Sequence, residues 1–206
     1  MLAEAYIQLR WKCYKFLFGL SGDNKIKLKQ LLLIAAGVFA AIVFNSAYAA
    51  SKEEINAEVR EATANFYKHT SAGKELAGKA SGMLVFPSVI KAGFGIGGEY
   101  GEGALIVKGK TVGYYNIAAA SIGLQIGAQA RSEIILFMND KVLKEFQSSQ
   151  GWKAGVDGSV ALATLGAGGS IDTETAKAPI IGFIFSNKGL MYNLSFEGSK
   201  ITKLDK

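Results

Sequence analysis

A glycine-rich segment is the first pattern in this chain that could do chemistry. Gly93, Gly95 and Gly98 match the G-x-G-x-x-G spacing of a loop that binds dinucleotide phosphates. Such a loop needs a helix that opens on the third glycine and an acidic residue about 20 positions further on. Here two more glycines follow within five residues, and no acidic residue lies between Glu102 and Glu133. The pattern does not predict a dinucleotide site.

A second phosphate-binding pattern is also incomplete. Gly109-Lys110-Thr111 resembles the end of a P-loop, but the glycine required five residues earlier is replaced by Ala104. The segment instead has the composition of a hairpin turn.

The titratable residues do not form a catalytic constellation. His69, the one histidine in the chain, lies near the end of an expected helix, where we predict a solvated residue. Glu99 and Glu102 have the residue types of an acid/base pair, but we expect solvated turn charges. Asp172 and Glu174 are too few for a calcium loop. We therefore predict no enzyme activity, no metal and no cofactor.

The glycines indicate a different structure, because they alternate along two predicted strands. In the first strand, Gly93, Gly95 and Gly97 share one face; in the second, Gly123 and Gly127 do. Glycine weakens a strand unless another backbone approaches closely or the strand bends at a corner. We therefore expect a strongly coiled sheet, with a helix or another sheet packed against the bare face.

The remaining periodicity predicts the other elements. Ser51 and Glu54 form a capping box before an amphipathic helix from Lys52 to about His69, and Asn139 or Asp140 caps one short internal helix. A further short turn is expected over 74–80. The expected strands are Met83–Phe86 (ended by Pro87), Ile90–Tyr100, Leu105–Val107, Val112–Ile117, Ser121–Phe137, Trp152–Leu162, Ile180–Ser186, Leu190–Phe196 and Ile201–Leu204. The predicted fold is α+β and predominantly β, a curled or barrel-like antiparallel sheet.

The first 49 residues read as a signal peptide, followed by one domain over 50–206. A lysine-rich stretch precedes the apolar run Leu31–Phe44, and small residues follow, so we expect cleavage after Ala49. Retention of the segment as an N-terminal anchor is the alternative, although the run is shorter than the roughly 20 residues of a spanning helix. Export would place the protein in the periplasm or outside the cell.

Removing this segment changes the charge of the chain. Six of the 23 Lys and Arg and two of the 17 Asp and Glu lie before residue 50, so the net charge falls from +6 to +2. This modest charge does not favour a nucleic-acid partner. Cys13 is lost as well, which removes disulfides and thiolate sites from the exported part.

The exported part resembles the SYLF domain family over nearly its whole length. The blocks that carry this resemblance are 82–87, 91–98, 114–116, 121–129, 137–138, 151–152 and 196–198. The resemblance implies a lipid-binding domain; eukaryotic relatives bind phosphoinositides and, in yeast, actin filaments. An exported bacterial protein would meet neither, so actin is not expected as a partner.

The resemblance therefore predicts an exported, non-enzymatic protein that associates with phospholipid or a membrane surface. In eukaryotic relatives an N-terminal amphipathic helix helps to contact the membrane, but the helix here is net acidic, which favours packing on the sheet. Lys91, Lys108, Lys110 and Lys188 are the expected head-group contacts. The alternatives are an envelope protein-interaction module, using the glycine-faced sheet or a sheet edge, and a small outer-membrane barrel.

Overall fold

The computed structural model describes residues 50–163, 171–186, 189–190, 196 and 198–206. The chain divides into two units at Ala49 and Ala50, and the described residues belong to the second unit. The prediction that a signal peptide ends here stays a prediction.

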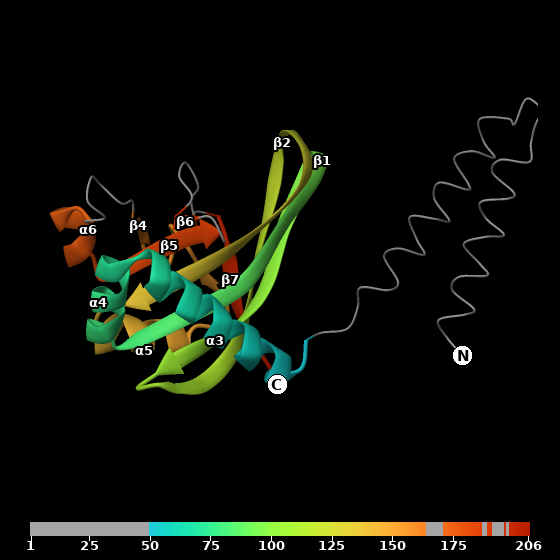
Figure 1. Ribbon diagram of the computed structural model, residues 1–206. Helices are drawn as coiled ribbons and strands as arrows, with labels where there is room; N and C mark the ends of the chain where they lie inside the picture. Colours follow the sequence, from blue (N-terminus) through green and yellow to red (C-terminus); the bar gives the residue numbers. More distant parts are fainter. Residues whose placement is uncertain (1–49, 164–170, 187–188, 191–195, 197) are drawn as a thin grey trace, which may run out of the picture. The chain divides into compact units, whose positions relative to one another are not determined.

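A seven-stranded sheet forms the body of the described part (Figure 1). Its central path runs β3–β7–β2–β5–β4, with β1 paired to β2 and β6 paired to β5. All these pairs are antiparallel except β4 with β5, which is parallel. The strands are β1 (Gly82–Val107), β2 (Lys110–Phe137), β3 (Trp152–Lys153), β4 (Ala161–Leu162), β5 (Ile180–Ser186), β6 (Gly189–Leu190) and β7 (Lys200–Leu204).

β1 and β2 form one long two-stranded ribbon, with 26 residues in β1 and 28 in β2. The connecting turn uses Lys108 (φ 50°) and Gly109 (φ 75°). Positive φ at both positions is the backbone of the turn that matches the twist of a hairpin, so this sequence prediction is confirmed.

The ribbon bends back on itself (Figure 1). Its two strands run together away from α3 and the rest of the sheet, turn over and return. The register shifts between Phe94 and Gly95, at this bend. We call residues 82–93 with 127–137 the first leg, and residues 97–107 with 110–121 the second leg. The tip consists of 92–98 and 120–128, whose ends are paired as Ala92 with Ala128 and Gly98 with Ala120.

The two legs lie against each other where the second leg has glycines. A methyl group on Gly101 would lie 2.7 Å from the carbonyl oxygen of Ser88, and one on Gly103 would overlap the carbonyl oxygen of Val85. The predicted close approach is therefore real at these two glycines. The element that approaches is the first leg of the same strand, rather than a helix or a separate sheet.

Four helices lie in the described residues. They are α3 (Lys52–His69), α4 (Ser71–Lys79), α5 (Asp140–Ser148) and α6 (Thr173–Lys177). α3 begins with the predicted capping box between Ser51 and Glu54. Its buried residues pack on one face of the sheet, where the Phe66 and Phe183 rings lie 4.8 Å apart. None of these helices is long and apolar enough to cross a bilayer.

A second core cluster lies on the opposite face of the sheet, under α5. Asn139 caps this helix by accepting a hydrogen bond from the backbone of Val142. Phe146 then packs on Phe137 and Trp152, with ring centroids 4.7 Å and 5.9 Å away. The sheet is therefore covered by a helix on each face.

The structure confirms the predicted α+β fold with its curled sheet, together with α3, α5, β5 and β7. It corrects the strand count before residue 138: the five separate strands expected there form only two, β1 and β2. Pro87 does not end a strand, because the register shift between Phe86 and Val89 accommodates it. The antiparallel prediction fails only at β4 with β5 among the described pairs.

Three more predictions about the elements need correction. The expected strand Trp152–Leu162 is a turn flanked by β3 and β4, since Gly155 adopts φ 86° and Asp157 accepts a hydrogen bond from the Lys153 backbone. The sequence predicted one internal helix, whereas α4 and α6 are present besides α5. Most of the expected strand Leu190–Phe196 lies outside the described residues.

Candidate functional site

A buried ionic cluster lies just below the tip and joins the two legs. Arg131 Nη2 donates to Glu99 Oε2 at 2.6 Å, and Arg131 Nε donates to Glu133 Oε1 at 2.7 Å. The side chains are 2%, 8% and 1% exposed for Arg131, Glu99 and Glu133. Ser199 Oγ, just before β7, donates to Glu99 Oε1 at 3.1 Å. Four residues from three segments thus form one network.

Strand periodicity explains how the cluster assembles. Arg131 and Glu133 are two residues apart on β2, so they point to the same face of the first leg. Glu99 lies on β1 immediately after the tip, on the second leg. The bend of the ribbon brings the Glu99 and Arg131 side chains together although 32 positions separate them.

Burial changes the acid–base properties of this cluster. It raises the pKa of Glu133 from 4.5 to about 7, and the attraction of Arg131 only partly offsets this rise. Burial alone would lower the pKa of Arg131, but the two carboxylates outweigh it and the net direction is upward. Arg131 Nη1 and Glu133 Oε2 are buried without a hydrogen-bond partner. Arg131 is paired with both carboxylates, and Ser199 donates to Glu99, so these contacts are those of a buried ion-pair network.

The expectation that Glu99 and Glu102 are solvated turn charges is wrong. Glu102, only 12% exposed, accepts hydrogen bonds from Lys206 Nζ at 2.7 Å and from the Tyr100 hydroxyl at 2.8 Å. Both carboxylates are therefore held in ion pairs. Sequence reasoning missed these ion pairs because the basic partners are distant in the chain and no local pattern indicates the pairing.

The tip is the second notable feature, because it carries no charge. Residues 92–98 contain no Asp, Glu, Lys or Arg, and β2 contains none from 111 to 130. The apolar residues that flank the tip are open to solvent: Ile90 is 55% exposed and Tyr100 is 49% exposed. Ala92, Ala120 and Ala130 are exposed as well. Figure 1 shows the tip standing away from the helices. Uncharged, exposed ribbon is a typical surface for association.

Part of the chain matches a known protein family. Residues 118–206, which include the second strand of the tip, Arg131, Glu133 and Ser199, match the family model Ysc84, described as a Las17-binding protein actin regulator. This stretch is a SYLF domain. The predicted resemblance is thereby confirmed for it, and no curated protein matches the chain.

The SYLF match does not extend over the whole sheet. The blocks 82–87, 91–98 and 114–116 lie outside the matched residues. β1, however, pairs with β2 from Gly82 with Phe137 to Val107 with Lys110. The first half of the described part and the SYLF stretch therefore share one continuous ribbon.

The structure does not bring the predicted head-group lysines together. Lys108 and Lys110 are exposed at the hairpin turn, where the second leg ends. Lys91 is half-buried beside the tip, in register with Gln129. Lys91 therefore lies on the first leg, whereas Lys108 and Lys110 lie at the end of the second leg that is away from the tip. Lys188 lies outside the described residues.

The predicted glycine positions meet across the ribbon. Gly93 is the partner of Gly127, and Gly95 is the partner of Gly123. Gly97 pairs with Ser121. Residues that are directly opposite in an antiparallel pair lie on one face, so in each of the first two pairs two glycines face each other. Sequence alternation could indicate the strands, but only the register shows that they are neighbours.

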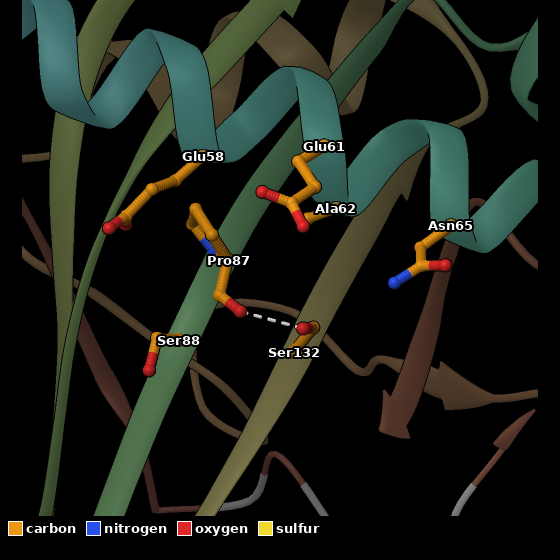
Figure 2. Close-up of a pocket in the computed structure, with 7 residues that line it drawn as sticks. All are labelled: Glu58, Glu61, Ala62, Asn65, Pro87, Ser88 and Ser132. Carbon is orange, nitrogen blue, oxygen red and sulfur yellow. Dashed lines mark hydrogen bonds between the residues drawn. The ribbon is translucent and has the colours of Figure 1, made fainter. Parts of the chain in front are cut away.

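Two hollows open on the surface of the described part. One, of about 180 Å³, lies between α3 and the first leg (Figure 2). Glu58, Glu61 and Asn65 line its helix side, and Ser132 Oγ donates to the carbonyl oxygen of Pro87 at 2.6 Å on its strand side. The other, of about 290 Å³, is mostly apolar and includes Trp152, Val160 and Ile180.

The titratable residues singled out in the sequence, His69 and Asp172, line neither hollow. His69 is exposed at the end of α3, as the sequence predicted. Asp172 caps α6 by accepting from the Thr175 backbone at 2.8 Å, which gives it a structural role. In the part of the chain that the structure describes, no three His, Cys, Asp or Glu side chains are grouped as metal ligands.

Proposed function

We propose that this chain is an exported, non-enzymatic protein of the cell envelope that associates with lipid membranes through the tip of the β1–β2 ribbon. The observation that carries the proposal is the uncharged tip with Ile90 and Tyr100 exposed at its base. The SYLF match supports a binding role in general. Periplasmic or secreted localisation rests on the N-terminal segment that ends near Ala49.

The hydrophobic effect favours this contact. Transfer of a fully exposed isoleucine side chain out of water contributes about 1.5–3 kcal/mol, and Ile90 is half-exposed. The 20 uncharged positions of β2 from 111 to 130 bring no charged side chain that would oppose the transfer. Lys91, next to the tip, adds up to ~1 kcal/mol near an anionic surface.

The backbone limits how deep the tip can go. A two-stranded ribbon has an outer edge on each strand, and unpaired backbone groups are costly in hydrocarbon. The tip therefore rests among the head groups and the first part of the acyl chains, as interfacial helices do. This is a peripheral mode of binding.

Helix α3 is not the membrane contact in this proposal. Its apolar residues Ile55, Val59 and Phe66 are buried against the sheet. Its polar side chains are net acidic, with Glu53, Glu54, Glu58 and Glu61 against Lys52, Arg60 and Lys68. Anionic lipid would be repelled rather than attracted by this face. Actin and phosphoinositides are not expected as ligands of an exported protein.

Flotation with lipid vesicles tests the proposal. The protein purified after expression of the full chain, with its mature N-terminus read by mass spectrometry, is mixed with vesicles of phosphatidylethanolamine and phosphatidylglycerol. We expect binding that Ile90→Asp weakens strongly. Val156→Asp is the matched control, because Val156 is 78% exposed but lies between β3 and β4. It should bind like the wild type.

Two results would count against this function. No flotation of the wild-type protein with any such mixture contradicts membrane association. Equal loss in the Ile90→Asp and Val156→Asp variants contradicts the tip as the contact. Recovery of one stoichiometric envelope protein without lipid dependence would favour the protein-interaction module, with a partner strand added at a sheet edge.

A further inference from the structure

We propose that the ion pair between Arg131 and Glu99 is a latch that holds the β1–β2 ribbon bent and so fixes how the tip is presented. The proposal rests on the tip as the membrane contact. It makes Arg131 a positioning residue: it acts on the tip through Glu99 and does not itself touch lipid.

The bend of the ribbon depends on interactions between its two legs. Ladder hydrogen bonds join β1 to β2 within each leg, and they would be equally satisfied in a straighter ribbon. Only contacts between the legs oppose straightening. The Arg131–Glu99 bond is such a contact: Arg131 lies on the first leg beside Val89, and Glu99 lies on the second leg beside Ala119.

The two residues of the pair lie at the base of the tip. Along β1, Glu99 is the first charged residue after the tip; along β2, Arg131 is the first charged residue after it. The pair therefore closes the base of the uncharged segment. No other charged residue lies between the tip and either member of the pair on these two sides.

A glycine next to the pair allows the two legs to approach each other. Gly101 lies two residues beyond Glu99, hence on the same face of β1, and packs on the backbone of Ser88 and Val89. This approach carries the Glu99 carboxylate to within 2.6 Å of the Arg131 guanidinium. Gly101 thus permits the close approach of the two legs, and the ion pair supplies a directional attraction between them.

Burial makes the latch strong. A carboxylate and a guanidinium that are nearly inaccessible interact with little screening by water or salt. Removal of Arg131 would leave two buried carboxylates without their cation, which is strongly destabilising, whereas removal of the Glu99 charge leaves Arg131 paired with Glu133 alone. Ser199 also donates to Glu99, so Glu99 is bonded to the segment before β7 as well as to the first leg.

The chain provides a matched pair of substitutions for a test. Glu99→Gln removes the carboxylate of the latch. Glu102→Gln removes a carboxylate three positions away on the same leg, where the partner is Lys206 at 2.7 Å and not a residue of the first leg. Both are conservative, and both break one ion pair of β1.

The readout is the position of the tip. Spin labels at Ala92→Cys and Lys153→Cys, two exposed positions on the tip and on β3, are placed in the Cys13→Ser chain. Their distance distribution is measured by pulsed electron paramagnetic resonance. We expect one narrow distribution in the parent chain and in Glu102→Gln, and a broadened or shifted one in Glu99→Gln. Vesicle affinity should fall by roughly fivefold or more in Glu99→Gln.

An unchanged distance distribution in folded Glu99→Gln overturns the latch. If circular dichroism shows that this variant does not fold, Arg131→Lys decides instead. Lysine keeps the charge but cannot bond both carboxylates with a planar fork. A broadened distribution then supports the latch, and a parental one contradicts it. If the parent chain does not bind vesicles, the proposed function fails, while the distance measurement still tests the latch.

Discussion

Gly103 lies against the carbonyl oxygen of Val85, so close that no side chain can stand between the two residues. The contact joins the two legs of a single strand. It gives two of the alternating glycines, Gly101 and Gly103, a physical reason: at these positions β1 passes over its own backbone. In a phosphate loop, glycine allows a ligand to approach the backbone. Here it allows another part of the same strand to approach.

Gly103→Ala should destabilise the fold by about 1–3 kcal/mol, because the added methyl group meets a backbone carbonyl that cannot rotate away. Urea unfolding followed by circular dichroism measures the change. Gly78→Ala in α4 is the control, since nothing lies within 4 Å of its added methyl group. It should be neutral or stabilising by up to about 1 kcal/mol. Equal stabilities for the two variants would contradict the close approach of the legs.

Glu133→Gln should flatten the pH dependence of stability. The folded pKa of Glu133, about 7, lies above its ordinary value of 4.5, so the folded state binds this proton more tightly than the unfolded state does. The resulting stabilisation is fully present below 4.5 and is lost as pH rises through 7.

The measurement is the free energy of unfolding of both proteins at about pH 5 and about pH 8. Relative to the variant, the wild type should lose up to about 3 kcal/mol between the two values. A difference that stays constant with pH would show that Glu133 titrates as an ordinary carboxyl group.

Phe146→Ala should destabilise the protein by about 3–5 kcal/mol, because it empties the space between three aromatic rings under α5. Trp152 lies beside the deleted ring, so its fluorescence should shift to longer wavelength as water enters. The other tryptophan, Trp11, is replaced by phenylalanine to isolate the signal. Unchanged emission together with unchanged stability would mean that α5 does not cover this face of the sheet.

Lys91→Gln should weaken binding to anionic vesicles by about fivefold, which corresponds to the loss of ~1 kcal/mol. Lys108→Gln should have little effect, because Lys108 lies at the turn that ends the second leg. Flotation at low and high salt compares the two variants. The opposite ranking would place the hairpin turn, rather than the tip, on the membrane.

Local signals in the sequence predicted the elements that local interactions determine. Ser51 and Glu54 cap α3 within one turn, and the Lys108-Gly109 turn needs only its own two residues. The alternation from Trp152 to Leu162 misled because Gly155 and Asp157 form a turn that the apolar period hides. Periodicity describes which face a side chain takes but not whether a partner strand exists.

The site was harder to predict, because distant contacts build it. The sequence around Glu99 is typical of a turn, which predicted a solvated charge. The bend of the ribbon instead brings Glu99 into contact with Arg131. The register shift between Phe94 and Gly95, which accompanies the bend, has no unique sequence signal among so many glycines. Among the predicted head-group residues that the structure describes, Lys91 alone lies beside the tip. A lysine at a turn has the same local sequence signal whether or not it faces a ligand.

The pairing of β2 has a consequence for how the molecule unfolds. Residues 114–118 of this strand pair with β7, residues 132–137 pair with β5, and nearly its whole length pairs with β1. No seam divides the sheet into halves that could melt one after the other, because every half would contain part of β2. Heating should therefore yield a single cooperative transition, and a force applied at one end of β2 should be shared by three neighbouring strands.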